Sequence, residues 1–292
     1  MRKMVRSWGF ILLTLFLCLF AQVITTSLAL AAGATTSLHV VKYDTDGKTV
    51  LTEKTVDYEW MEKNIQVYGD GKTHYYHQGP VFEGDMWDGD EVNNLKDKGA
   101  VKGTAVKDLC NLVGGMDAKD EVMLVSIDSW HTEFAYDNIY KPAASQGSIA
   151  LCWYNGEDSV DGESYGIGYP ANNAYHSAMQ IVFMTEETNK DGKHVFGNTD
   201  MKTALPEEKY QHFFEGQYPS TNGLSGKWIS EVRIYSGGVP ENLNVAADDG
   251  STTTENETET EKSGSWLPIV LVVAGVVLVG IYFLMRRKTN EK

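Results

Sequence analysis

Two long apolar runs, one near each end of the chain, stand apart from the mixed pattern between them. Residues 266–285 form an uncharged run of about 20 residues, the length that crosses roughly 30 Å of hydrocarbon as one helix. Three cationic residues, Arg286, Arg287 and Lys288, follow it at once, as expected on the cytoplasmic side of a membrane. The pattern therefore predicts a transmembrane helix at 266–285 and a cytoplasmic tail at 286–292.

The N-terminal apolar run has the features of a secretory signal peptide. Three basic residues among the first six positions precede the apolar residues 10–23, and Ala-Leu-Ala at 29–31 fits a small-residue cleavage site. We therefore predict a signal peptide at 1–31, a mature chain that begins near Ala32, and a domain outside the cell. The alternative is an uncleaved anchor, which leaves the domain outside as well.

Between these runs, alternating apolar and polar positions and β-branched residues predict six strands. They are Leu38–Tyr43, Val50–Val56, Glu121–Ser126, Ser148–Trp153, Met179–Met184 and Trp228–Tyr235. Strands separated by loops, with few helices, predict an α+β fold: a β-rich mixed single domain over residues 32–240. Together with the C-terminal transmembrane helix, this gives a membrane-anchored protein.

Two short helices are predicted inside this domain. Residues Tyr58–Asn64 form the first, with Trp60 and Met61 directed inward. The second is Ala105–Val113, whose apolar residues include Cys110 on a buried face. Thr104 is the expected N-cap of this second helix, because a threonine hydroxyl accepts a hydrogen bond from a free amide of the first turn, and the two glycines that follow would end it.

The residues that follow the domain change character abruptly. Residues 241–265 are acidic and rich in threonine, and they cannot bury a core, so an extended stalk is predicted. Asn256 begins a short N-glycosylation sequence in this stalk.

Charge restricts the partners of the domain. Residues 32–285 hold 18 basic and 39 acidic residues, a net charge of −21. A surface of this sign repels nucleic acid and anionic lipid, so neither is expected as a partner. It favours solubility, or a loose association with divalent cations.

The cysteines and the common catalytic motifs give little support to an enzyme. Only Cys110 and Cys152 remain after signal cleavage, and both lie in apolar settings that are typical of packing residues. A disulfide between them is one open alternative. The chain contains no phosphate-binding loop or dinucleotide fingerprint, and no acid–base pair with distinctive spacing. We therefore predict no catalytic residues and leave enzymatic activity undecided.

A candidate metal site lies in an aromatic stretch. His74 and His77 are three residues apart, which brings two imidazoles together in a helical turn and separates them in a strand. A third ligand could come from Glu83, Asp85 or His131. The alternative is an aromatic loop packed on the core.

Two acidic stretches resemble parts of calcium-binding loops, at 44–47 (Asp-Thr-Asp-Gly) and at 84–91. Neither has the full spacing of such a loop. The first is predicted instead to be a hairpin turn.

An ordered set of motifs extends from about residue 36 to residue 237. It comprises the short helix at 58–61, VKGTAVKDL at 101–109, EVMLVSIDSW at 121–130, ALCWYNGE at 150–157, GYP at 168–170 and GKWISEVRIY at 226–235. In this order the set resembles the sulfite oxidase-type molybdopterin-binding domain. THYYHQGP at 73–80 within this frame is also similar to uncharacterised cell-surface proteins of methanogenic archaea.

The resemblance implies a sulfite oxidase-like fold and a set of cofactor-binding positions. These positions are Asp128, Gly168, Tyr169, Pro170 and Lys227.

Two departures from the family pattern concern catalysis. The family's molybdenum-ligating cysteine precedes the helix at 105–113, but residues 32–109 contain no cysteine. The arginine that follows GYP in the family is also missing, since Ala171 and Asn172 stand there. The fold can therefore be present without the chemistry.

The leading prediction is a membrane-anchored extracellular protein of sulfite oxidase-like fold, without molybdenum catalysis, that acts as a ligand-binding or surface-interaction module. Its pocket would be surrounded by the loops 74–78, 128–131 and 168–172 and would take a small ligand or a cell-surface partner. The alternative is an extracytoplasmic oxidoreductase that holds molybdopterin with a non-cysteine metal ligand, such as His74 or His77.

Overall fold

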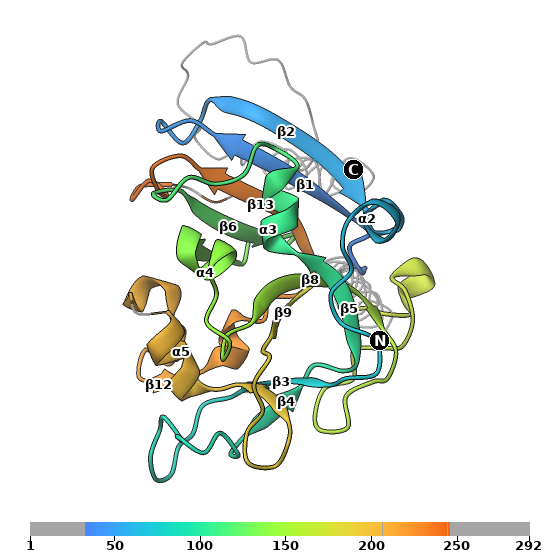
Figure 1. The fold of residues 1–292 in the computed structure, drawn as a ribbon, viewed down its shortest axis with the longest axis vertical. Coiled ribbons are helices and arrows are strands. Elements are labelled where there is room, and N and C mark those ends of the chain that lie inside the picture. The colour runs from blue at the N-terminus through green and yellow to red at the C-terminus, as the bar shows by residue number, and fades with distance from the viewer. Residues whose placement is uncertain (1–32, 206, 244, 246–292) are drawn as a thin grey trace, which may run out of the picture. The chain divides into compact units, whose positions relative to one another are not determined.

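A computed structural model describes residues 33–205, 207–243 and 245, and β-strands dominate these residues (Figure 1). They form one β-rich mixed unit with few helices, as predicted. The predicted signal peptide, the transmembrane helix at 266–285, the cytoplasmic tail and most of the stalk lie outside the described residues. Within the described residues, no helix is long and apolar enough to cross a membrane.

A five-stranded sheet with the order β2-β1-β13-β6-β7 forms one end of the domain (Figure 1). Its strands are β1 (Ser37–Tyr43), β2 (Val50–Asp57), β6 (Glu121–Ser126), β7 (His131–Ala135) and β13 (Ile229–Tyr235). Strands β1 and β13 are parallel, and the other pairs are antiparallel. The first and last described strands thus lie side by side at the centre of the sheet, and β2 and β7 form its edges.

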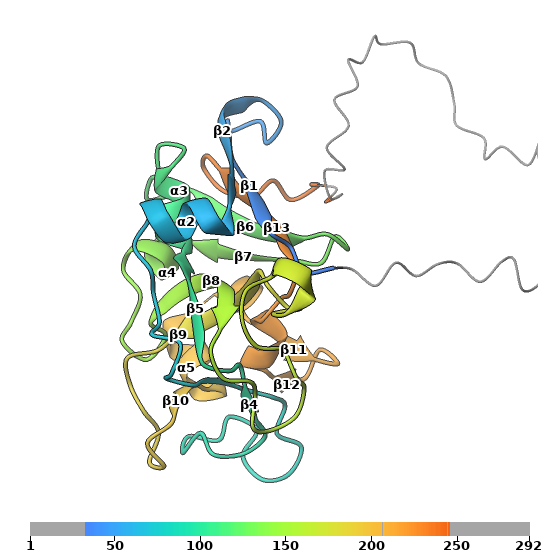
Figure 2. The same ribbon diagram turned by 90° about the vertical axis from the view of Figure 1, so that its right-hand side faces the viewer.

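Two three-stranded sheets and a small hairpin complete the strand content. One sheet has the order β5-β8-β9, and the other has the order β10-β3-β4. The strands are β3 (Tyr75–Gln78), β4 (Leu95–Asp97), β5 (Val101–Ala105), β8 (Ser148–Asn155), β9 (Gln180–Met184), β10 (His194–Phe196), β11 (Phe213–Phe214) and β12 (Tyr218–Pro219). The two views agree that β8 and β9 lie between the five-stranded sheet and the β3–β4 pair (Figure 2).

The helices are short. They are α2 (Tyr58–Asn64), α3 (Val106–Asn111), α4 (Tyr136–Tyr140) and α5 (Asn198–Ala204), with 3-10 turns η1 (Ala171–Asn173), η2 (Glu208–Tyr210) and η3 (Thr221–Leu224). Helix α3 contacts both β13 and β8, so it fills the space between two sheets. None of these helices is stable alone at this length, and each depends on the apolar side that it buries.

The main core lies between the five-stranded sheet, α3 and one face of β8. Successive residues of a strand point to opposite faces, so Leu151 and Trp153 enter this core, whereas Ala150 and Cys152 enter a second, smaller cluster. Cys110 belongs to the main core. The two cysteines therefore lie on opposite sides of β8, and both are free thiols rather than the disulfide considered from the sequence.

The strongly patterned elements agree with the sequence predictions. All six predicted strands are present within two residues at each end, and the first helix has the predicted bounds, Tyr58–Asn64. Its N-cap is Asp57, whose Oδ1 accepts a hydrogen bond from the amide of Trp60 at 2.7 Å. The predicted hairpin turn at 44–47 joins β1 and β2, and the Asp46 carboxylate accepts the amides of the two residues after Gly47.

The second predicted helix was too long at both ends, and its cap was wrong. The helix is Val106–Asn111, and Thr104 belongs to strand β5. The hydroxyl of Thr104 accepts a hydrogen bond from the indole nitrogen of the buried Trp153 at 3.0 Å. Thr104 and Ala105 pair with Leu151 and Ala150 of β8, so the strand continues to Ala105 and the helix begins after it.

The folded domain also extends beyond its predicted end at Pro240. Leu243 and Val245 pack with Val239 against Met123 and Val125 on the outer face of the five-stranded sheet. These two apolar residues lie in a stretch that is polar on average. The predicted stalk therefore starts later than residue 241.

Candidate functional site

The two histidines predicted as metal ligands do not share a site. His74 directly precedes β3 and His77 lies within it, and the extended backbone gives them different neighbours. The His74 Nδ1 lies 2.9 Å from the buried carboxylate of Asp97. His77 is fully buried, packs edge-on against Phe183, and accepts the amide of the same residue through Nε2 at 3.1 Å. Burial lowers the pKa of His77 well below its usual value, so this histidine is a neutral core residue. The described residues contain no group of three metal-ligating side chains.

The predicted GYP turn supports the structure around α2. The hydroxyl of Tyr169 donates a hydrogen bond to Glu62 on α2 at 2.8 Å, and its ring stacks on Trp153. This bond to a carboxylate, with burial, raises the pKa of Tyr169 to about 12. Gly168 pairs with the backbone of Asn155, and Pro170 is buried. All three residues are thus held by contacts within the protein.

Lys227 belongs to a cluster of charged side chains beside a buried lysine. Its ammonium pairs with Glu163 and lies over the ring of Tyr165. Lys98 is buried in the same cluster and donates to Asn222 at 2.6 Å and to the Tyr165 hydroxyl at 3.2 Å. Burial, reinforced by the charge of Lys227, lowers the pKa of Lys98 to about 7. This cluster joins the loop around Tyr165 to the rest of the domain.

Asp128 forms the tight turn between β6 and β7. Its carboxylate accepts hydrogen bonds from the Ser126 hydroxyl and from the amide of Trp130, which hold its pKa below the usual value. The side chain is exposed and shapes the hairpin. Asp128 lies just after β6, as predicted. Neither Asp128 nor the GYP residues 168–170 line either of the two cavities described below.

The donors present do not fit a bound molybdopterin. Cys110 and Cys152 are fully buried, and burial raises the pKa of both thiols, so neither offers a thiolate. The polar side chains at the expected cofactor positions, those of Asp128, Tyr169 and Lys227, already have protein partners.

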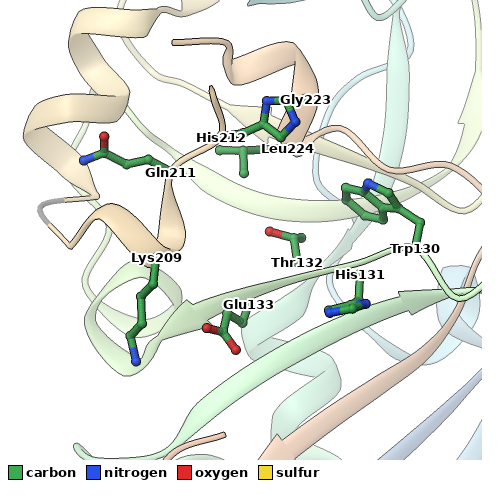
Figure 3. Close-up of a pocket in the computed structure, with 9 residues that line it drawn as sticks. All are labelled: Trp130, His131, Thr132, Glu133, Lys209, Gln211, His212, Gly223 and Leu224. Atoms are coloured by element: carbon green, nitrogen blue, oxygen red, sulfur yellow. The ribbon is translucent and has the colours of Figure 1, made fainter. Parts of the chain in front are cut away.

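A polar cavity lies instead along the free edge of β7 (Figure 3). It has a volume of about 260 Å³, and we call it the β7 groove. Its lining residues are Trp130, His131, Thr132, Glu133, Lys209, Gln211, His212, Gly223 and Leu224. The groove therefore joins one edge strand to segments about 80 and 90 residues later in the chain.

Two ring side chains of the groove each pack against a glycine. A Cβ at position 223 would lie 2.0 Å from Nδ1 of His212, and a Cβ at position 226 would lie 2.0 Å from the indole ring of Trp130. Only glycine leaves room for these rings, so Gly223 and Gly226 set the positions of both walls.

Two polar groups of the groove lack partners within the described protein. The His212 Nδ1 is shielded from solvent and makes no hydrogen bond with a described residue. Burial lowers the pKa of His212, which keeps the imidazole neutral. The carboxylate of Glu133 makes no hydrogen bond or ion pair with a described residue, and burial together with the charge of Glu121 raises its pKa. The His212 Nδ1 is covered by Gly223, whereas the half-buried Glu133 carboxylate favours a polar ligand that supplies its missing partner.

The remaining charge in the groove is compensated. Lys209 pairs with Glu121, whose carboxylate also accepts the Tyr210 hydroxyl and the amide of Val239. The lysine is thereby held at one end of the groove, near Glu133. The charges of Glu121 and Lys209 compensate each other, so Glu133 is the remaining acidic side chain that lines the groove.

Sequence reasoning located only part of this groove. Trp130 and His131 come from the predicted loop 128–131, but the loops 74–78 and 168–172 contribute no lining residue. His212 and Glu133 were missed, because no local motif connects them. The glycines at 223 and 226, in a segment without a predicted turn, were the available signal of a close approach.

A second cavity, of about 310 Å³, contains a pair of carboxyl groups. Glu91 from the loop before β4 and Asp200 from α5 lie together there, and burial with the charge of Asp200 raises the pKa of Glu91 to about 8. One of the two groups is therefore protonated at neutral pH. The pair joins its loop to α5.

A scan of protein-family models finds no match to this chain, and no match is found among curated proteins either. The sulfite oxidase-type resemblance thus stays a prediction from the ordered motifs, and the β7 groove must be interpreted from its own chemistry.

Proposed function

We propose that this chain is a membrane-anchored extracellular protein of sulfite oxidase-like fold, without molybdenum catalysis, whose domain binds a small polar ligand in the β7 groove. The signal sequence at 1–31 and the apolar run at 266–285 support the location, and the ordered motifs between 36 and 237 support the fold. The enzyme alternative has no supporting observation, because the expected cofactor positions are engaged in protein contacts.

One observation carries the binding proposal: the groove contains a half-buried Glu133 carboxylate that makes no hydrogen bond or ion pair with a described residue, and the ring of His212 lines the same groove. A buried polar group without a hydrogen bond costs about 1–3 kcal/mol, so a ligand that satisfies it gains that free energy. The volume of about 260 Å³ is below the roughly 300–1,000 Å³ that holds drug-sized ligands. The expected ligand, or the part of it that enters the groove, has the size of one or two amino acids or one sugar.

The test is a binding screen with the full-length chain in a mild nonionic detergent. Free amino acids, dipeptides and monosaccharides are titrated while the fluorescence of Trp130 and the NMR signals of the histidine rings are recorded. His212→Ala should abolish the response, and the matched control His39→Ala, which changes a histidine on β1 paired with Glu53, should leave it intact. A response that is unchanged in His212→Ala would place the binding outside the groove, and no response to these ligands or to the peptide probe described below would refute binding in the groove.

A second measurement addresses the enzyme alternative. The chain is expressed in a host that makes molybdopterin, and its metals and oxidised pterin are measured by mass spectrometry and fluorescence. We expect no stoichiometric pterin. Near-stoichiometric pterin with molybdenum or tungsten would overturn the proposal in favour of an oxidoreductase.

A further inference from the structure

The edge of β7 that faces the groove carries backbone groups without partners. The amide of Ser126 donates to the carbonyl of Trp130, so the polar groups of Trp130 point toward β6. The direction in which the backbone N–H and C=O groups point alternates from one residue to the next along an antiparallel strand. The register places Leu124 opposite Thr132, so the groups of Thr132 also point toward β6. The N–H and C=O groups of His131 and Glu133 therefore point away from β6, toward the groove. Neither residue's backbone bonds to another described residue.

We propose that the β7 groove binds an extended peptide segment, which adds as a sixth strand beside β7 and presents a cationic side chain to Glu133. This inference rests on the proposed binding function of the same groove and names the class of ligand. A peptide main chain has the alternating donors and acceptors that His131 and Glu133 lack, which is the basis of recognition by strand addition.

The side chains around this edge have the arrangement that strand addition requires. Thr132 and Trp130 lie on one side of β7, and His131 and Glu133 lie on the other (Figure 3). An added strand would alternate in the same way, so every second side chain of the peptide would enter the space walled by His212 and Leu224. Its other side chains would lie beside Glu133.

The charge of the site favours a cationic peptide. Glu133 makes no direct ion pair with a described residue, although the charges of Lys209 and His131 act on it from a distance, and Lys209 is paired with Glu121. Residues 32–285 carry a net charge of −21, which attracts a positively charged segment and repels an acidic one. An arginine or lysine opposite Glu133 would lie on the same face of the enlarged sheet and could pair with it.

The other edge of the same sheet is less suited to a partner. Strand β2 is exposed on both faces for most of its length, and its centre carries Glu53 and Lys54. Charged residues at the centre of an edge strand oppose pairing with another chain. The ammonium group of Lys54 also lies over the ring of Trp60, at 4.3 Å from the ring centre.

The experiment uses the full-length chain in nonionic detergent and the probe acetyl-Thr-Val-Lys-Val-Thr-amide. Amide hydrogen exchange is measured by NMR with and without the probe. In the free protein the amides of Thr132 and Phe134 should exchange slowly, and those of His131 and Glu133 should exchange fast. The probe should slow exchange at His131 and Glu133 by at least about tenfold, since both amides gain a hydrogen bond.

A backbone variant separates main-chain recognition from side-chain charge. Glu133→Pro removes an amide that points toward the groove and bonds to no described residue, which an edge strand tolerates, and should abolish binding of the probe. Glu133→Gln keeps the amide and should weaken binding only a few-fold. A probe that is N-methylated at its central amides should bind at least about tenfold more weakly than the parent peptide.

The outcomes distinguish this inference from the function on which it rests. If the probe leaves His131 and Glu133 unprotected, or if the N-methylated probe binds as well as the parent, strand addition is wrong. Should amino acids or sugars still bind through His212 in that case, the groove remains a ligand site and only the peptide assignment fails. If nothing binds in the groove, both proposals fail.

Discussion

Lys98 offers a direct test of the electrostatics of the domain, because its ammonium group is buried and titrates near neutral pH. We predict that Lys98→Met removes a pH dependence from the free energy of unfolding. The side chain is 2% exposed, and burial lowers its pKa from 10.5 to about 7. The unfolded chain therefore binds more protons than the folded domain between pH 7 and 10.5, so stability rises with pH across this window.

The magnitude follows from the two pKa values. Below pH 7 the lysine is charged in both states, and the cost of burying that charge is fully present. Between pH 6 and pH 9 the folded form loses its proton, which should raise the free energy of unfolding by about 2.5 kcal/mol. The variant lacks the titrating group, and its curve should lack this rise.

The hydrogen bonds that Lys98→Met also removes do not change the pH dependence of the free energy of unfolding. Methionine cannot donate to Asn222 or to the Tyr165 hydroxyl, so Lys98→Met loses both bonds at every pH. That loss shifts the whole stability curve, whereas the titration changes its slope. Glu91 also titrates in this range with the opposite sign, but it is present in both proteins and cancels in the difference.

The assay is urea unfolding of the full-length chain in nonionic detergent at pH 6, 7, 8 and 9, followed by tryptophan fluorescence. The matched control is Lys63→Met, which changes a lysine on α2 whose side chain is 72% exposed. It should follow the parent protein at every pH. Equal slopes for Lys98→Met and the parent would show that Lys98 is solvated or paired in solution, and the reasoning would be refuted.

Three further predictions concern other groups. Cys110 and Cys152 should resist a thiol reagent in the folded protein and both react in urea without prior reduction; a lack of free thiols after unfolding would contradict the structure. Glu91→Gln should stabilise the protein more at pH 9 than at pH 5, by about 2 kcal/mol after allowance for solvent screening, as measured by urea unfolding. Because the pKa of Glu91 is raised in the folded protein, the free energy of unfolding of the parent falls as the pH rises from 4.5 through about 8. Glu91→Gln removes one carboxyl of the pair and keeps Asp200, so the variant should lack this fall. Asp57→Ala should lower the free energy of unfolding by about 1 kcal/mol through loss of the α2 cap, and an unchanged urea midpoint would exclude that role.

The elements that the sequence determined are those with a strong local pattern. Alternation of apolar and polar residues located the six main strands, and the bounds of α2 follow from the Asp57 cap and the helical spacing after it. These patterns act between neighbours in the chain, so they can be interpreted before the fold is known. The strands β3, β4, β5, β7 and β10 to β12 were missed, because with only two to five residues they are too short for a clear alternating pattern.

Tertiary structure decided the end of β5 and the fate of the candidate ligands. Thr104 has the residue type of a helix cap, yet it pairs with Leu151 of β8 and its hydroxyl accepts a hydrogen bond from the indole of Trp153, so the helix begins later. His74 and His77 are close in sequence, but an extended strand sends one to Asp97 and the other into the core. A spacing of three residues predicts convergence only in a helix.

The sequence by itself determined the main strands, the acidic surface and the buried cysteines, because hydrophobic pattern and charge are properties of single residues and their neighbours. Only the tertiary structure decided where a ligand can bind. The β7 groove brings Glu133 from an edge strand together with His212, which lies 79 residues later, and Gly223 makes room for the imidazole. Such a site depends on which segments meet across the fold, and that is fixed by the packing of the whole core.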